Sequence, residues 1–314
     1  MRLGPESRRQ VGDNYESIIF QLLRDFGWIS VRTNSDIEVP TSVRPSGRQG
    51  IDGNFLYFDP FYRYDIGVHV ESKKVKDIAS FRSELPKWLV DINSALLFTS
   101  AQLYSLPFKG VSHSGSVQIQ ESLLSVWIDE PFDQGTFRDI VEQATKALHS
   151  DKKKTLEEFA SVAVVTNSRL QQLQAVVIEL WAFMGRHRMP GYYSFEYPRL
   201  GKFDAPNLMM LLGDHLFIRA NSDTNSGQYR LIAFYLGTTS TQRVNFFTSS
   251  LIDTLGPHIN GSQGLSVFVW DMPPSDPEKV GLWQTLFREN VAPKYGSSDG
   301  FVSVTGFNPN YLRL

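Results

Sequence analysis

The sequence contains no cysteine among its 314 residues, so disulfide bonds and cysteine-ligated zinc are excluded. It also lacks a strong charge of either sign, because 31 Lys and Arg residues face 33 Asp and Glu residues, a formal net charge of -2. A strongly basic chain is therefore excluded, although a local basic patch is compatible with this balance. No apolar run reaches the roughly 20 residues that a membrane-spanning helix needs, and the first residues lack the apolar core of a signal peptide. We expect a soluble, cytoplasmic protein.

The chain is rich in residues that form a core. Hydrophobic residues make up 41% of it and aromatic residues 13%, which argues against disorder as the main state. The length suits two ordinary domains. The charged, apolar-poor segment "SDKKKTLEE" is the most linker-like stretch, and we therefore expect one domain over residues 1–150 and a second α/β domain over residues 151–314.

Apolar periodicity predicts how helices and strands alternate. The first half is predicted as a helix (12–26), a strand (28–33), a loop (34–50), two strands that pair as a hairpin (53–58 and 66–72), a helix (77–92), two strands (95–100 and 123–129) and a helix (136–149). The second half is predicted to mix a strand at 161–166, a long helix, a hairpin, a further strand and a final helix. The chain is thus predicted to be α/β throughout.

The stretch "DIGVHVESKK" contains His69, Glu71 and Lys73 on a predicted strand. Side chains two residues apart share one face of a strand, so these three point the same way. Asp52, in "QGIDGNF", lies at the start of the strand predicted to pair with this one, so we expect its carboxylate beside Glu71. Glu16 lies on the shoulder of the apolar face of the first helix and is expected to look toward the same cluster.

Neighbouring carboxylates beside an ammonium group suit a hard divalent cation. Mg²⁺ takes oxygen ligands, usually one or two carboxylates with waters and substrate phosphates, and it offsets the charge that develops in phosphoryl transfer. Asp52, Glu71 and the backbone carbonyl of Ser72 are the candidate ligands. Lys73 is placed to orient an attacking water or to stabilise the transition state. Without a cation the carboxylates would repel one another.

Simpler interpretations of the same residues stay open. Glu71 with Lys73 is also compatible with a surface ion pair, worth at most about 1 kcal/mol. Asp52 stands before a glycine, and Asp-Gly is a frequent turn pair. Asp13 with Glu16 three residues later resembles a capping box at the start of a helix.

Three motifs occur in order along the first half: "GxxxE" from Gly12 to Glu16, "GIDG" at 50–53 and "VESKK" at 70–74. On the predicted α-β-β-β-α-β order, they resemble the PD-(D/E)xK, or restriction-endonuclease-like, nuclease superfamily. The resemblance covers roughly residues 10–150. Ile51 stands where the family name has proline, a position that varies.

The "D…ExK" signature of that family corresponds to Asp52, Glu71 and Lys73 in this sequence, and its helix glutamate to Glu16. The resemblance implies a mixed-sheet core and a nuclease that cuts DNA with Mg²⁺ or Mn²⁺. Asp52, Glu71 and the carbonyl of Ser72 are then the metal ligands. The catalytic set implied by the resemblance is Asp52, Glu71, Lys73 and Glu16, with Glu16 helping to position the metal. Candidate nucleic-acid contacts are Arg44, Arg48 and Lys74.

The layout is similar to bacterial restriction and anti-phage defence proteins, so we expect that role. We also expect a second copy of the chain or a partner protein to restrain or target the activity, because an unrestrained nuclease would endanger its own cell. RNA as a substrate stays open. The alternative is a catalytically silent nuclease-fold subunit that binds nucleic acid or scaffolds a complex; the intact signature counts against it.

Overall fold

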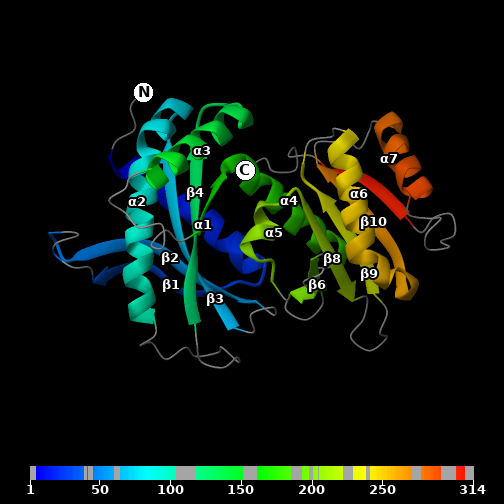
Figure 1. Ribbon diagram of the computed structural model, residues 1–314, viewed down its shortest axis with the longest axis horizontal. Coiled ribbons are helices and arrows are strands. Elements are labelled where there is room, and N and C mark those ends of the chain that lie inside the picture. The colour runs from blue at the N-terminus through cyan, green and yellow to red at the C-terminus, as the bar shows by residue number, and fades with distance from the viewer. Residues whose placement is uncertain are drawn as a thin grey trace. The chain divides into compact units, whose positions relative to one another are not determined.

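The chain folds into two compact units, seen in the computed structural model of Figure 1. The first unit comprises Met1–Arg24, Trp28–Phe58 and Arg63–Leu170, and the second comprises Asp25–Gly27, Asp59–Tyr62 and Gln171–Leu314. The sequence-based boundary at residue 150 precedes this division at Leu170. The structure describes residues 5–38, 41, 45–59, 64–103, 117–150, 161–184, 193–197, 201–203, 205–221, 229–237, 241–270, 277–290 and 302–307.

The first unit is a mixed α/β core in the predicted α-β-β-β-α-β order. Its elements are α1 (Pro5–Asp25), β1 (Ile29–Glu38), β2 (Arg48–Asp59), β3 (Tyr64–Val75), α2 (Ile78–Leu103), β4 (Val117–Ile128), α3 (Gln134–Ser150) and β5 (Ser161–Thr166). The strands form one sheet in the order β1-β2-β3-β4-β5. β1 and β2 are antiparallel, whereas β4 runs parallel to both β3 and β5.

Apolar periodicity explains how the two long helices attach to this sheet. α1 buries Ile19, Leu22 and Leu23, which are three and four residues apart, and Gly27 lies just beyond the helix with a φ of 89° that glycine adopts readily. α2 buries Phe81 and Leu85 in a core cluster shared with β4 and α3. Such stripes are the usual way in which a helix is fixed to a sheet.

Two sequence-based predictions in this unit were wrong. The segment 95–100, predicted as a strand, belongs to α2, which runs without interruption through Pro86 to Leu103. A short apolar run does not distinguish a strand from a buried helical segment. The predicted loop 34–50 also begins and ends in strands, because β1 extends to Glu38 and β2 starts at Arg48.

The second unit is also α/β. Its elements are α4 (Asn167–Met184), which starts at the end of the first unit, β6 (Tyr193–Tyr197), β7 (Gly201–Phe203), α5 (Leu208–Leu212), β8 (His215–Asn221), β9 (Tyr229–Tyr235), α6 (Thr241–Leu255), a 3-10 helix (Gly256–Gly261), β10 (Ser262–Trp270), α7 (Pro277–Asn290) and β11 (Val302–Phe307). The sheet order is β11-β10-β9-β8-β6-β7, parallel from β9 to β11 and antiparallel elsewhere. The predicted hairpin is β8 with β9.

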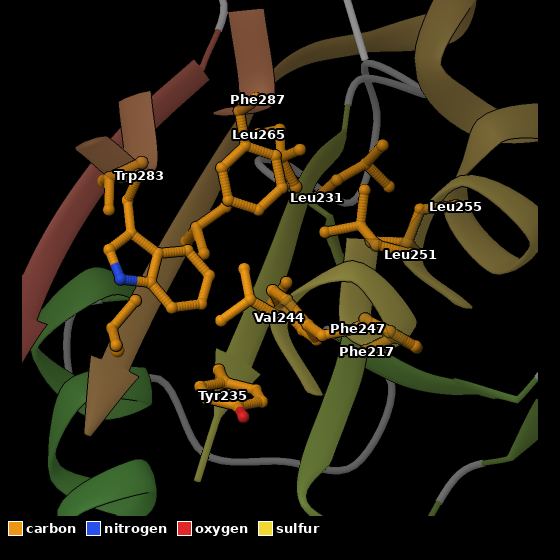
Figure 2. Close-up of a cluster of buried hydrophobic side chains, with 14 of the residues drawn as sticks. Phe217, Leu231, Tyr235, Val244, Phe247, Leu251, Leu255, Leu265, Trp283 and Phe287 are labelled. Atoms are coloured by element: carbon orange, nitrogen blue, oxygen red, sulfur yellow. The ribbon is translucent and has the colours of Figure 1, made fainter. Parts of the chain in front are cut away.

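An aromatic core holds the second unit together (Figure 2). Phe247 on α6 is fully buried, and its ring lies 5.8 Å from that of Phe217 and 5.0 Å from that of Tyr235, measured between centroids. The same ring makes edge contacts with Trp283 and Phe287 on α7. Phe247 therefore joins both helices to the sheet.

No helix within the described ranges is long and apolar enough to cross a membrane.

Phe247→Ala is expected to destabilise the second unit by about 3–5 kcal/mol, because it removes buried surface and leaves a cavity. The neighbouring Phe246 is 65% exposed and offers a matched control, since Phe246→Ala deletes the same atoms from the surface. Chemical denaturation of the two variants measures the difference. Equal losses of unfolding free energy would contradict the assignment of Phe247 to the centre of this core.

Candidate active site

His69, Glu71 and Lys73 lie on one face of β3, as strand alternation predicts. Glu71 and Lys73 point to one face, where Lys73 Nζ lies 2.7 Å from Glu71 Oε1. His69 lies on the same face, with Nε2 3.7 Å from Glu71 Oε2. The Glu71 side chain is only 14% exposed and that of Lys73 29%, so this pair is more enclosed than an ordinary surface salt bridge.

Asp52 on β2 reaches the same place. The backbone N–H of Ser72 donates a hydrogen bond of 2.7 Å to Asp52 Oδ2, which puts the aspartate beside the residue that follows Glu71. Asp52 lies within β2 and not at a turn. Gly53 is instead required by packing, because a Cβ there would lie 2.8 Å from the ring of Phe20 on α1. The "GIDG" motif thus combines the candidate carboxylate of Asp52 with a close approach of helix and strand.

These side chains open into a cavity of about 540 Å³ within the first unit. It is lined by residues of β1, β2, β3 and α2: Asn34, Ser35, Asp36, Gln49, Gly50, Ile51, Asp52, Glu71, Lys73 and Asp91. Four of them are carboxylates and one is a lysine. The cavity therefore carries an excess of negative charge, which a bound cation would offset.

Burial and like charge both act on Asp52. Removal from water raises the pKa of the Asp52 carboxyl above its ordinary value, and the charge of Glu71 raises it further, while Lys73 and the Ser72 N–H oppose the shift. Burial lowers the pKa of His69 to about 4. His69 is therefore neutral near pH 7, and its Nδ1 lies 3.4 Å from Asn54 Oδ1.

The carboxylates fit a divalent cation. Glu71 Oε2 is buried and has no hydrogen-bond partner, and Asp52 uses Oδ2 for the Ser72 N–H. An orphaned carboxylate oxygen beside a second carboxylate is costly unless a positive group lies between them. No set of three or more His, Asp or Glu side chains with metal-binding geometry occurs in the described ranges. A cation held by Asp52 and Glu71 would thus complete its shell with other oxygens, as Mg²⁺ commonly does.

The structure does not bring every candidate residue into the cavity. Glu16 is partly buried on α1 and is not among the lining residues. Lys74 alternates to the other face, where it pairs with Asp129 at 3.0 Å and lies over the Tyr15 ring. Arg48 is exposed at the start of β2 and does not line the cavity.

The candidate contact Arg44 lies outside the described residues. The capping-box interpretation of Asp13 with Glu16 was wrong, because α1 already begins at Pro5 and Asp13 is interior to it.

Sequence reasoning missed four of the residues that line the cavity. Asn34, Ser35 and Asp36 come from β1, in a segment predicted to be a loop, and Asp91 comes from α2. Only the antiparallel pairing of β1 with β2 brings the first three to the cavity, and no short motif marks that pairing. The one local signal is Asn34, since asparagine is frequent where a backbone turns left-handed.

The first unit is thus a mixed-sheet α/β core that carries a carboxylate pair and a lysine on adjacent strands. The family model described as "GAPS4 protein PD-(D/E)XK nuclease domain" matches residues 3–169. The chain belongs to this family of PD-(D/E)XK nuclease domains, which confirms the resemblance drawn from the motifs. A search of curated proteins finds no match.

Asp52→Asn is expected to raise the free energy of unfolding of the cation-free protein at pH 7. The amide keeps an oxygen for the Ser72 N–H and removes the repulsion with Glu71. Because the pKa of Asp52 is raised in the folded state, the protonated carboxyl contributes to the stability of the wild type. This contribution is lost as the pH rises through that pKa. The advantage of the variant should therefore vanish below the ordinary aspartate value of 3.8. Denaturation in EDTA across this pH range tests it; a less stable variant at pH 7 would contradict it.

Added Mg²⁺ or Mn²⁺ is expected to stabilise the protein by about 1.4 kcal/mol at about ten times the dissociation constant. Glu71→Gln should lose most of this gain, because it removes the negative charge of the carboxylate whose Oε2 has no hydrogen-bond partner. Glu84→Gln makes the same chemical change at an exposed position of α2 and should keep the gain. Thermal unfolding with and without the cation provides the measurement, and an equal gain in both variants would rule out this site.

Proposed function

We propose that the chain is a divalent-cation-dependent endonuclease that hydrolyses phosphodiester bonds of DNA with Mg²⁺ or Mn²⁺. Membership of the nuclease family supports nucleic acid as the substrate class. The observation that carries the proposal is the enclosed cluster of Asp52, Glu71 and Lys73, with one carboxylate oxygen left unpaired.

In this proposal Asp52, Glu71 and the backbone carbonyl of Ser72 hold the cation. When bound, the cation supplies polarisation of the phosphoryl group and charge neutralisation. Lys73 keeps its ammonium in the cavity through the contact with Glu71, so it is positioned to donate hydrogen bonds to the attacking water or to the phosphoryl oxygens. His69, which is neutral, and Asn54 are buried next to Glu71 and add no charge there. Glu16 is not part of this proposed set.

We propose a division of labour between the units. The family match ends at residue 169, so the nuclease chemistry is assigned to the first unit. The second unit has its own sheet and aromatic core, and we assign it to targeting, regulation or assembly with a partner protein or second copy. The resemblance to restriction and anti-phage defence proteins supports a defence role in the cytoplasm.

Purified protein is expected to cleave plasmid DNA in Mg²⁺ or Mn²⁺ and not in EDTA. Asp52→Ala should abolish cleavage, because the cation loses a ligand. Lys73→Ala should lower the rate by about a hundredfold or more, the usual cost of removing one transition-state donor. Lys76→Ala, at an exposed lysine of the same segment, removes the same charge away from the cavity and should cleave normally.

Cleavage that persists in EDTA or survives Asp52→Ala would overturn the assignment. Labelled RNA under the same conditions distinguishes an RNA-directed nuclease from one that acts on DNA. Binding of nucleic acid without cleavage by the wild type, on either substrate and with or without a partner protein, would favour the catalytically silent subunit.

A further inference from the structure

Asn34 on β1 has an unusual backbone. Its φ is 47°, and among the residues that the structure describes it is the one non-glycine residue with positive φ. L-residues reach this left-handed region at a cost of about 1–2 kcal/mol, with asparagine among the most tolerant. Such strain persists where the surrounding structure imposes it, and it is frequent at functional sites.

The strained residue lies next to the proposed catalytic carboxylate. In the β1–β2 ladder Thr33 pairs with Gly53 and Ser35 pairs with Ile51, so Asn34 stands across from Asp52. Asn34 is exposed and lines the same cavity as Glu71 and Lys73. Because Asn34 and Asp52 line one cavity, a single bound ligand can contact both side chains.

The neighbouring residue supports the same interpretation. Ser35 Oγ is buried and has no hydrogen-bond partner, and Ser35 also lines the cavity. Buried hydroxyls without a protein partner are uncommon, and one that lines a cavity is placed to bond to a ligand there. Asn34 and Ser35 thus form a neutral polar edge beside the Asp52 carboxylate.

Charge decides what this edge would bind. The other polar residues that line the cavity include Asp36 and Asp91, which repel a phosphate. Asn34 offers an amide NH₂ group that donates two hydrogen bonds without adding negative charge. Uncharged side-chain donors of this kind are common phosphate contacts in nucleic-acid complexes.

We propose that Asn34 is a substrate-contacting residue: its side-chain amide donates to a non-bridging phosphate oxygen of the nucleic-acid strand and holds the strand against Asp52 and Glu71. The left-handed backbone presents the amide at this position. This inference rests on the proposed nuclease function, and it names a substrate contact outside the Asp52, Glu71 and Lys73 set.

Asn34→Gly removes the side-chain amide and keeps the backbone conformation, because glycine adopts positive φ without strain. It therefore tests the amide separately from the backbone. The variant should be as stable as the wild type or more so, yet its kcat/KM for cleavage should fall by about tenfold to a hundredfold, the value of a hydrogen bond to a charged group. The fall should appear mainly in KM. Asn34→Asp keeps size and backbone preference but presents an anion, so its loss should be larger.

Asn245→Asp, at an exposed position of α6, introduces the same charge outside the first unit and serves as the control. The second readout is binding of a labelled DNA oligonucleotide in Mg²⁺, measured by fluorescence anisotropy, with Lys73→Ala added to every protein to slow cleavage. Weaker binding in the order wild type, Asn34→Gly, Asn34→Asp supports the inference even if the wild type does not cleave, an outcome that would sink the nuclease proposal alone. Equal binding and equal cleavage by all folded variants would overturn the inference.

Discussion

The site depends on one electrostatic constraint, the placement of the Asp52 and Glu71 carboxylates together in an enclosed cavity. Burial and mutual repulsion raise the pKa of Asp52, and Lys73 and the Ser72 N–H offset only part of this cost. One oxygen of Glu71 remains without a hydrogen-bond partner. A cation bound between two such groups would remove the repulsion and would also satisfy the unpaired oxygen, so its binding would stabilise the fold.

The surrounding sheet supplies the rigidity that this constraint needs. β3 is central in the sheet, between β2 and β4. Its N-terminal half is buried at Ile66, Val68 and Val70. Beyond Lys73 the strand returns to the core at Val75, which packs with α2 and α3. Buried apolar residues therefore hold β3 in place on both sides of Glu71 and Lys73. On β2 the close packing of Phe20 over Gly53 fixes the strand directly beside Asp52.

Interactions between residues close in the sequence could be predicted from it, whereas those that depend on distant segments could not. Strand alternation is local, so the shared face of Glu71 and Lys73 was predictable, and a hairpin sufficed to bring Asp52 to them. The course of residues 95–100 was not, because an apolar segment is compatible with a strand or a buried helix until packing selects one. Asn34 was missed because its place at the cavity depends on the β1–β2 register, which no short motif encodes.

The central claim is that Asp52 and Glu71 bind one divalent cation between them, and anomalous diffraction from crystals soaked in Mn²⁺ tests it most directly. The account predicts an anomalous peak within coordination distance of the free Asp52 oxygen and of Glu71 Oε2, at about 2.0–2.3 Å from each. Lys73 would remain beside the site. A saturating soak with no peak there, or with Mn²⁺ bound only by residues outside this cavity, would contradict it.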